Sequence, residues 1–254
     1  MNKFAIHSIP GFAEPLSCWS HLIAAGIFAL LAISLMRRAV RGSSQPGAAG
    51  PVARVAGVGI FCVSVVALLA ISGVYHLLDF NSTGRSVLLR VDYAAIFFLI
   101  AGTYTPICTI LLRGFLRAVI LVLVWTIAVT GITLKIVFFT QMAGPVGTVI
   151  YMVLGCGGFL GVFFFGRRYG VSFVEPLFFG GIIYIAGGAI QLSGYPTLIP
   201  GVVGPHEVFH LAVLFGISFH WKFIARFADG QMPQTTSELR ADKSLTGNPQ
   251  AGSR

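Results

Sequence analysis

The sequence predicts an all-α integral membrane protein, a bundle of seven transmembrane helices. Apolar residues make up 56% of the 254 residues and charged residues only 10%, against roughly 25% charged residues in soluble domains. The mean hydropathy is +0.87, and the apolar residues form uncharged runs of the roughly 20 residues that a bilayer-spanning helix needs. The cationic residues lie in short clusters between these runs. The net charge of +9 therefore indicates membrane topology, not a nucleic-acid-binding patch.

The first four runs are separated by clusters of charged residues. The first begins at Pro15, and it is too long for a signal-peptide core, so we expect it to be retained as a helix. The fourth is interrupted only by Lys135, near its end. The predicted spans are residues 15–36, 55–78, 93–112 (with a start near residue 89 as an alternative) and 118–139.

The last three runs are bounded by turn residues and arginines. Gly144 and Pro145 separate the fourth run from the fifth, and Arg167 and Arg168 separate the fifth from the sixth. The predicted spans are residues 146–166, 174–193 and 206–226, with turn material over residues 194–205. We expect a short leader (1–14), a transmembrane domain (15–227) and a disordered polar tail (228–254).

The distribution of Lys and Arg predicts the orientation in the cell membrane. The linkers after the first, third and fifth spans and the carboxyl side of the seventh carry most of the cations: Arg37, Arg38, Arg41, Arg54, Arg113, Arg117, Arg167, Arg168, Lys222, Arg226, Arg240, Lys243 and Arg254. The other side has Lys3, Arg85, Arg90 and Lys135. The positive-inside rule then places the amino terminus outside and the carboxyl terminus in the cytoplasm.

Polar and ionisable residues gather at one depth of the predicted bundle. They lie at the starts of the first, third and seventh spans and at the end of the second, which share one membrane face because successive helices run in opposite directions. This face is the less cationic one, so we expect the site toward the outside. Ionisable groups inside membrane spans are costly and mark functional sites. The residues are Glu14, Ser17, His21, Ser72, His76, Asp92, His206 and His210.

The histidines in this set have the spacing of metal ligands. His206 and His210 are related as i and i+4, which places both imidazoles on one helical face. With His76 they offer three neutral imidazoles, the donor set of a catalytic zinc with an open fourth position. Asp92 could hold a water molecule as base or acceptor, and Ser72 could orient a ligand or stabilise an oxyanion.

Each residue also has a purely structural interpretation. Asp92 can complement a helix dipole, His206 and His210 can pair with Glu207 or Glu14 at the interface, and Ser72 can bond its own helix. Their common depth favours a site. For three residues at or next to the start of the first span, support of the site and helix-end structure both remain open: Glu14, Ser17 and His21.

Three motifs, in this order, resemble the haemolysin III family. They are Ser72-Gly73-Val74-Tyr75-His76, then Val91-Asp92-Tyr93-Ala94-Ala95-Ile96 with Ala101-Gly102-Thr103-Tyr104-Thr105-Pro106, then His206-Glu207-Val208-Phe209-His210. The segment from Glu14 to His21 is similar to the family's first-helix signature. This family belongs with the progestin and adiponectin receptors and, more distantly, with the alkaline ceramidases, within the CREST superfamily of membrane hydrolases.

The resemblance implies a seven-helix bundle with zinc bound by His76, His206 and His210, a water between the metal and Asp92, and Ser72 beside them. The relatives suggest hydrolysis of a lipid amide such as ceramide, a receptor role, or haemolysis and membrane homeostasis. The predicted orientation is inverted relative to the adiponectin receptors.

Three functions follow as hypotheses. The first is a zinc-dependent hydrolase of a lipid amide or ester, with a membrane lipid as substrate or ligand and no nucleic-acid partner. The second is a non-enzymatic membrane-homeostasis or sensor protein in which zinc braces the helices. A pore or transporter ranks last, because transport sites usually lie near the midplane between repeats. The sequence leaves the substrate, turnover, the identity of the metal and the oligomeric state open.

Overall fold

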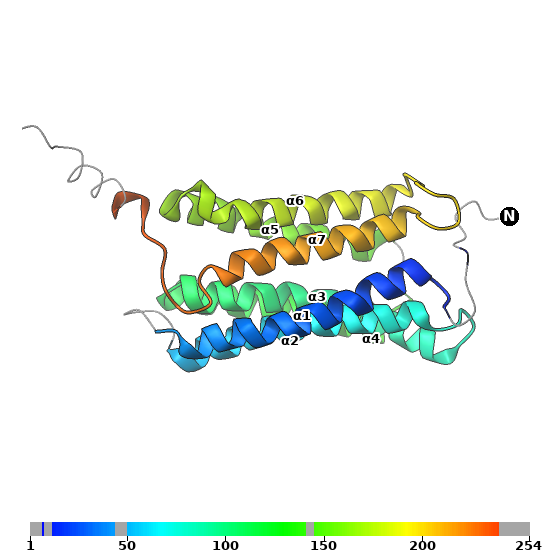
Figure 1. Cartoon of the computed structure of the whole chain (residues 1–254), viewed down its shortest axis with the longest axis horizontal. Helices are drawn as coiled ribbons and strands as arrows, with labels where there is room; N and C mark the ends of the chain where they lie inside the picture. Colours follow the sequence, from blue (N-terminus) through cyan, green and yellow to red (C-terminus); the bar gives the residue numbers. More distant parts are fainter. Residues whose placement is uncertain (1–6, 8–11, 44–49, 141–144, 239–254) are drawn as a thin grey trace, which may run out of the picture.

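The computed structural model describes residue 7 and residues 12–43, 50–140 and 145–238. Within these ranges it has seven helices that are long and apolar enough to cross a membrane, and they lie side by side along the long axis of the molecule (Figure 1). This arrangement confirms the predicted fold class, and the orientation of the termini stays a prediction. The helices are α1 (Pro15–Arg41), α2 (Pro51–Leu77), α3 (Thr83–Leu111), α4 (Gly114–Val137), α5 (Pro145–Tyr169), α6 (Val171–Ser193) and α7 (Pro205–Ala225).

Several helices extend beyond the apolar runs that predicted them. α1 continues to Arg41 rather than ending near residue 36, and α3 begins at Thr83 rather than at residue 93 or 89. Ser82 caps α3, since its hydroxyl accepts a hydrogen bond from the backbone N–H of Arg85 at 3.2 Å. Hydropathy detects only the part of a helix that lies in hydrocarbon, whereas polar residues continue the helix beyond it. Asp92 consequently lies inside α3 and not at its start.

The helices form a closed bundle in which chain neighbours pack together. α1 packs on α2, α2 on α3, α3 on α4, α5 on α6 and α6 on α7, and α1 also contacts α7. Trp221 of α7 joins three of them, because its ring contacts Phe28 of α1 at 5.0 Å and Phe61 of α2 at 5.3 Å between centroids. Near the end of α2, Gly73 lets α1 approach closely: a Cβ there would lie 2.6 Å from Cγ of Leu22.

Residues that follow α7 pack against the bundle. Phe227 and Ala228 are fully buried, and Asp229 accepts a hydrogen bond from Arg38 at 3.1 Å. The Thr236 hydroxyl donates to the carbonyl of Arg167 at 3.2 Å. Apolar and polar contacts therefore hold the described start of the predicted tail to α1 and α5, and the predicted domain boundaries stay predictions. Residues 239–254 of the predicted tail and residues 1–6 and 8–11 of the predicted leader lie outside the described residues.

Candidate metal centre

Three histidines from two helices meet at one end of the bundle. His76 lies in the last turn of α2, and His206 and His210 lie in the first two turns of α7. Their ligand nitrogens all lie within 4.8 Å of one another, and the ring centroids are 4.5 to 5.2 Å apart. The sequence separates His76 from the other two by four helices, so only the antiparallel course of α2 and α7 brings them together. We refer to these three residues as the histidine cluster.

His76 is held by Glu14, the residue before α1. Nδ1 of His76 lies 2.7 Å from Oε2 of Glu14, and the same carboxylate forms an ion pair with Arg85. Arg85 also donates to the carbonyls of Tyr75 and Leu78, at 3.2 and 2.8 Å. Burial by itself raises the pKa of the Glu14 carboxyl, but the hydrogen bonds from His76 and Arg85 outweigh it and hold that pKa below its usual range. Glu14 is therefore ionised and only accepts hydrogen bonds.

The other two histidines are held through the same ring nitrogen. Nδ1 of His206 lies 3.3 Å from Oε1 of Gln191, near the end of α6. Nδ1 of His210 lies 2.9 Å from Nε2 of His21 on α1. A carboxylate and an amide oxygen are acceptors, and a neutral imidazole offers one acceptor nitrogen. In each histidine of the cluster, Nδ1 can thus carry the hydrogen and leave Nε2 unprotonated.

The Nε2 atoms of the histidine cluster fit a shared cation. Those of His206 and His210 are 3.0 Å apart, and two lone pairs that face each other at this distance repel unless a proton or a cation lies between them. Nε2 of His76 is buried and has no hydrogen-bond partner among the described residues. Nitrogens bound tetrahedrally to one zinc ion lie roughly 3.3 Å apart, within the range that the cluster spans. Three imidazoles are also a donor set that zinc and similar transition ions accept.

Asp92 and Ser72 lie beside the cluster. The Asp92 carboxylate lies near the Ser72 hydroxyl and the His76 imidazole. Ser72 is 2% exposed and lies one turn before His76 on α2. Because Asp92 lies inside α3, it does not complement the dipole at that helix start. Among the described residues Ser72 makes no hydrogen bond to its own helix. The catalytic roles of both residues stay predictions.

Glu14 and His21 contact the histidine cluster, whereas Ser17 contacts a residue that caps α7. Glu14 and His21 meet His76 and His210 directly, as described above. Ser17 instead donates to Oε1 of Glu207 at 3.2 Å. The other oxygen of Glu207 accepts from the backbone N–H of Gly204 at 3.0 Å and caps the start of α7. Ser17 therefore positions α7 as a whole, not one ligand.

Two residues of this region were not predicted from the sequence. Gln191 lies near the end of α6, and the ends of even-numbered helices share the membrane face of the predicted site. This shared depth is the feature of the sequence that could have indicated Gln191. Arg85 was counted only as a topological charge, although it is 7% exposed and pairs with Glu14. No local pattern shows that two residues so distant in the chain meet.

Comparisons with known proteins show which family the chain belongs to. Residues 12–221 match the family described as Haemolysin-III related. The chain is 37% identical to the Hemolysin-3 homolog of Bacillus subtilis (strain 168) over 129 residues, which cover 50% of this chain and 59% of that protein. It is 32% identical to Hemolysin-3 of Bacillus cereus over 136 residues, which cover 54% of this chain and 60% of that protein.

These alignments span about three fifths of the curated relatives' length. The family match is broader, since it covers most of the chain and includes all three residues of the histidine cluster. The chain therefore belongs to the haemolysin III family, as its three motifs suggested.

Proposed function

We propose that the chain is a zinc-dependent membrane hydrolase that acts on a lipid amide or ester. The observation that carries this proposal is the convergence of three Nε2 atoms, each on a ring whose Nδ1 meets an acceptor, beside an aspartate and a serine. His76, His206 and His210 would hold the ion. When bound, zinc supplies a Lewis acid for a carbonyl oxygen and lowers the pKa of water.

Asp92 and Ser72 supply the groups that move and orient protons. The Asp92 carboxylate would accept a proton from the attacking water at one oxygen and deliver it to the departing nitrogen or oxygen of the lipid. The Ser72 hydroxyl would donate to Asp92 and hold the carboxylate in one orientation. Both side chains belong to helices, α3 and α2, so the backbone fixes their positions.

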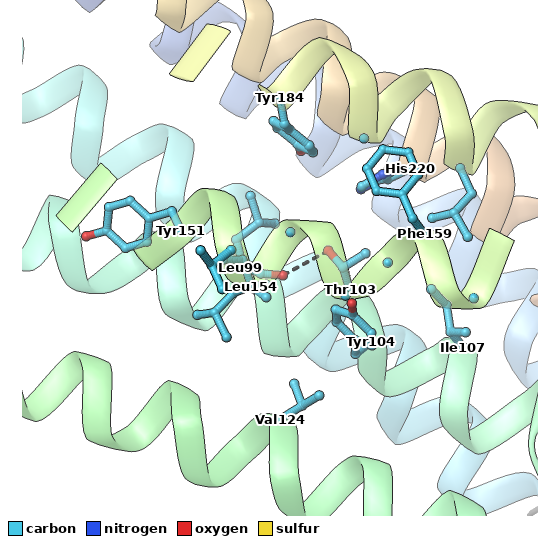
Figure 2. Close-up of a pocket in the computed structure, with 18 of the residues that line it drawn as sticks. Leu99, Thr103, Tyr104, Ile107, Val124, Tyr151, Leu154, Phe159, Tyr184 and His220 are labelled. Atoms are coloured by element: carbon cyan, nitrogen blue, oxygen red, sulfur yellow. Dashed lines mark hydrogen bonds between the residues drawn. The ribbon is translucent and has the colours of Figure 1, made fainter. Parts of the chain in front are cut away.

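An apolar cavity next to the cluster supports a lipid as substrate. It has a volume of about 590 Å³ and lies among α3, α4, α5, α6 and α7. Phe209, whose ring lies 6.0 Å from that of His210, lines it, and so does Ile96, one turn beyond Asp92. Figure 2 shows that its other lining residues include Leu99, Ile107 and Val124. None of the three cluster histidines lines the cavity, so a lipid whose chain fills it would reach the histidine cluster only if its polar linkage extends past Phe209 or Ile96.

The proposal is tested with Asp92→Asn in purified, zinc-loaded protein. Wild-type protein should release fatty acid from a ceramide or a lipid ester, measured by mass spectrometry. The variant should be slower by about 100-fold or more, because general acid–base catalysis contributes factors of that size, while its zinc content stays equal. Asp79→Asn, in the exposed turn before α3, is the matched control and should keep full activity. Zinc-loaded wild-type protein that releases no fatty acid would contradict the proposal.

One observation favours a second candidate, a non-enzymatic protein with structural zinc. The cluster and its Nδ1 partners come from α1, α2, α6, α7 and the residue before α1, so an ion there would tie together helices that are distant in the chain. In that case Asp92→Asn spares the biological effect, whereas His76→Ala lowers the stability of the bundle. Loss of the effect with intact metal and fold would favour catalysis instead.

A further inference from the structure

A second hollow lies between α1 and α2, apart from the cavity of Figure 2 and from the histidine cluster. It is a groove of about 820 Å³ with apolar walls. None of its lining residues belongs to the other cavity or to the candidate site. On α1 the walls include Ala29, Ile33 and Val40, and on α2 they include Gly59 and Val63.

One end of this groove carries two arginines. Arg37 and Arg41 line it, and as i and i+4 residues of α1 they lie on one helical face. Both are exposed, and neither has a hydrogen-bond or ion-pair partner among the described residues. Other arginines nearby are satisfied: Arg38 bonds Asp229 at 3.1 Å, and Arg54 bonds the carbonyl of Ala39 at 3.0 Å.

We propose that the groove binds an anionic phospholipid, with an acyl chain along the apolar walls and the phosphate between Arg37 and Arg41. Guanidinium groups match phosphate oxygens in geometry and charge, and basic pockets between transmembrane helices bind acidic headgroups. Arg41 also lies at the depth of a lipid headgroup. His21 and Arg41 lie on α1 about 30 Å apart at 1.5 Å per residue, which is roughly the thickness of the hydrocarbon core. With His21 near one surface of the membrane, Arg41 therefore lies near the other.

The pairing of walls and charges selects this occupant over two others. A second apolar helix in the groove would cover the walls but leave both guanidinium groups without a counter-ion. Free inorganic phosphate would satisfy the arginines but leave the apolar walls unfilled. A molecule that is anionic at one end and apolar along its length satisfies both parts.

The charge part of the proposal is tested with Arg37→Gln/Arg41→Gln. The protein is reconstituted in vesicles of phosphatidylglycerol and phosphatidylcholine with identical acyl chains, and the lipid that it retains is measured by native mass spectrometry. Wild-type protein should prefer phosphatidylglycerol. In the double variant, the ratio of retained phosphatidylglycerol to phosphatidylcholine should fall about fivefold for each arginine removed. This is the factor expected for one cation at an anionic surface.

The matched control is Arg113→Gln/Arg117→Gln. These arginines are also spaced i and i+4 and lie where α3 ends and α4 begins, but they do not line the groove. The control should keep the wild-type preference. An equal loss in both double variants would show general surface charge and would overturn the proposal, as would an unchanged preference in Arg37→Gln/Arg41→Gln.

The wall part is tested with Gly59→Leu, which fills the groove and leaves both arginines in place. A Cβ at Gly59 would lie 3.6 Å from Cε of Met36, an ordinary contact, so α2 accommodates the start of a side chain. Gly26→Leu on α1 is the control, because a Cβ there meets nothing within 4 Å and the residue does not line the groove. Gly59→Leu should retain less phosphatidylglycerol than Gly26→Leu. Equal retention, or displacement of the lipid by inorganic phosphate, would overturn the proposal.

Discussion

The two ends of the bundle both contain buried ionisable residues, but they satisfy them in different ways. At the histidine end, where α1 and α7 begin and α2 ends, ionisable side chains bond one another: Glu14 bonds His76 and Arg85, and His21 bonds His210. At the arginine end, where α1 and α7 end, arginines bond mainly backbone carbonyls. The buried Arg54 bonds Ala39 and Gly42, and the exposed Arg226 bonds Ser172 and Phe173.

This difference separates a binding site from a structural network. The last carbonyls of a helix need donors, and a guanidinium supplies several, so the contacts of Arg54 complete the backbone hydrogen bonding at the end of α1. The contacts at the histidine end fix three rings and still leave Nε2 of His206 facing Nε2 of His210, and Nε2 of His76 without a hydrogen-bond partner among the described residues. Substitutions at the arginine end should therefore change stability, and those at the histidine end should change metal binding.

The largest effect is expected for His206→Ala/His210→Ala. Two of three ligands are removed, so bound zinc should fall from about one ion per chain to trace levels. Elemental analysis of purified protein measures this directly. His220→Ala is the control, since His220 lies on the same helix but outside the cluster, and it should keep its zinc. A double variant that still binds about one zinc ion per chain would contradict the assignment of metal binding to the histidine end.

Arg54→Met should have the opposite effect, because it should lower stability without changing zinc binding. Arg54 is 2% exposed, and its loss leaves buried carbonyls without their donor, at a cost of about 2 to 4 kcal/mol for the bonds involved. The free energy of unfolding should fall by that amount while the zinc content stays unchanged. Arg113→Gln, at an exposed residue, should stay within about 0.5 kcal/mol of wild type. A drop in zinc with unchanged stability would reverse our assignment of this end.

A substitution that keeps the shape of Glu14 sharpens the comparison. Glu14→Gln retains an acceptor for Nδ1 of His76 but removes the negative charge that favours the Nδ1–H form and pairs with Arg85. Zinc affinity, measured by competition with a chelator, should fall about 10- to 100-fold, as for other residues that support metal ligands. Glu175→Gln, at an exposed carboxylate of α6, should bind zinc like wild type. Equal affinities for the two variants would remove Glu14 from the site.

The smallest effect is expected at Gln191. Its amide is neutral and lies 3.3 Å from His206, a longer contact than those made by Glu14 and His21. Gln191→Leu should weaken zinc binding by less than Glu14→Gln does, within about tenfold for one neutral hydrogen bond. Gln191→Glu should restore the affinity, because a carboxylate accepts more strongly. No recovery in Gln191→Glu would indicate that the contact only fills space.

Much of the fold could be predicted because the bilayer imposes simple physical limits. The length and charge of the apolar runs predict all the described helices. The alternation of helix direction predicts that His76 lies at the depth of His206 and His210. The helix ends were less predictable. Hydropathy reports the hydrocarbon layer, whereas α3 begins at Thr83 because Ser82 caps it.

The partners within the site could not be predicted from the sequence in the same way. The pairing of Glu14 with Arg85 depends on how α1 enters the bundle, where the backbone N–H of Glu14 also donates to the carbonyl of His76 at 3.1 Å. The role of Gln191 depends on which face of α6 meets α7. Periodicity places residues on a helical face, but rotation about the helix axis is decided by packing among several helices at once.

The central claim is that Nε2 atoms of His76, His206 and His210 bind one ion. Zinc K-edge X-ray absorption on the purified protein tests it most directly, because it counts the ligands and measures their distances. The account predicts three imidazole nitrogens at about 2.0–2.1 Å and one further light atom, with one imidazole lost in His76→Ala. A spectrum with sulfur at about 2.3 Å, or with the same imidazole count in His76→Ala, would contradict it.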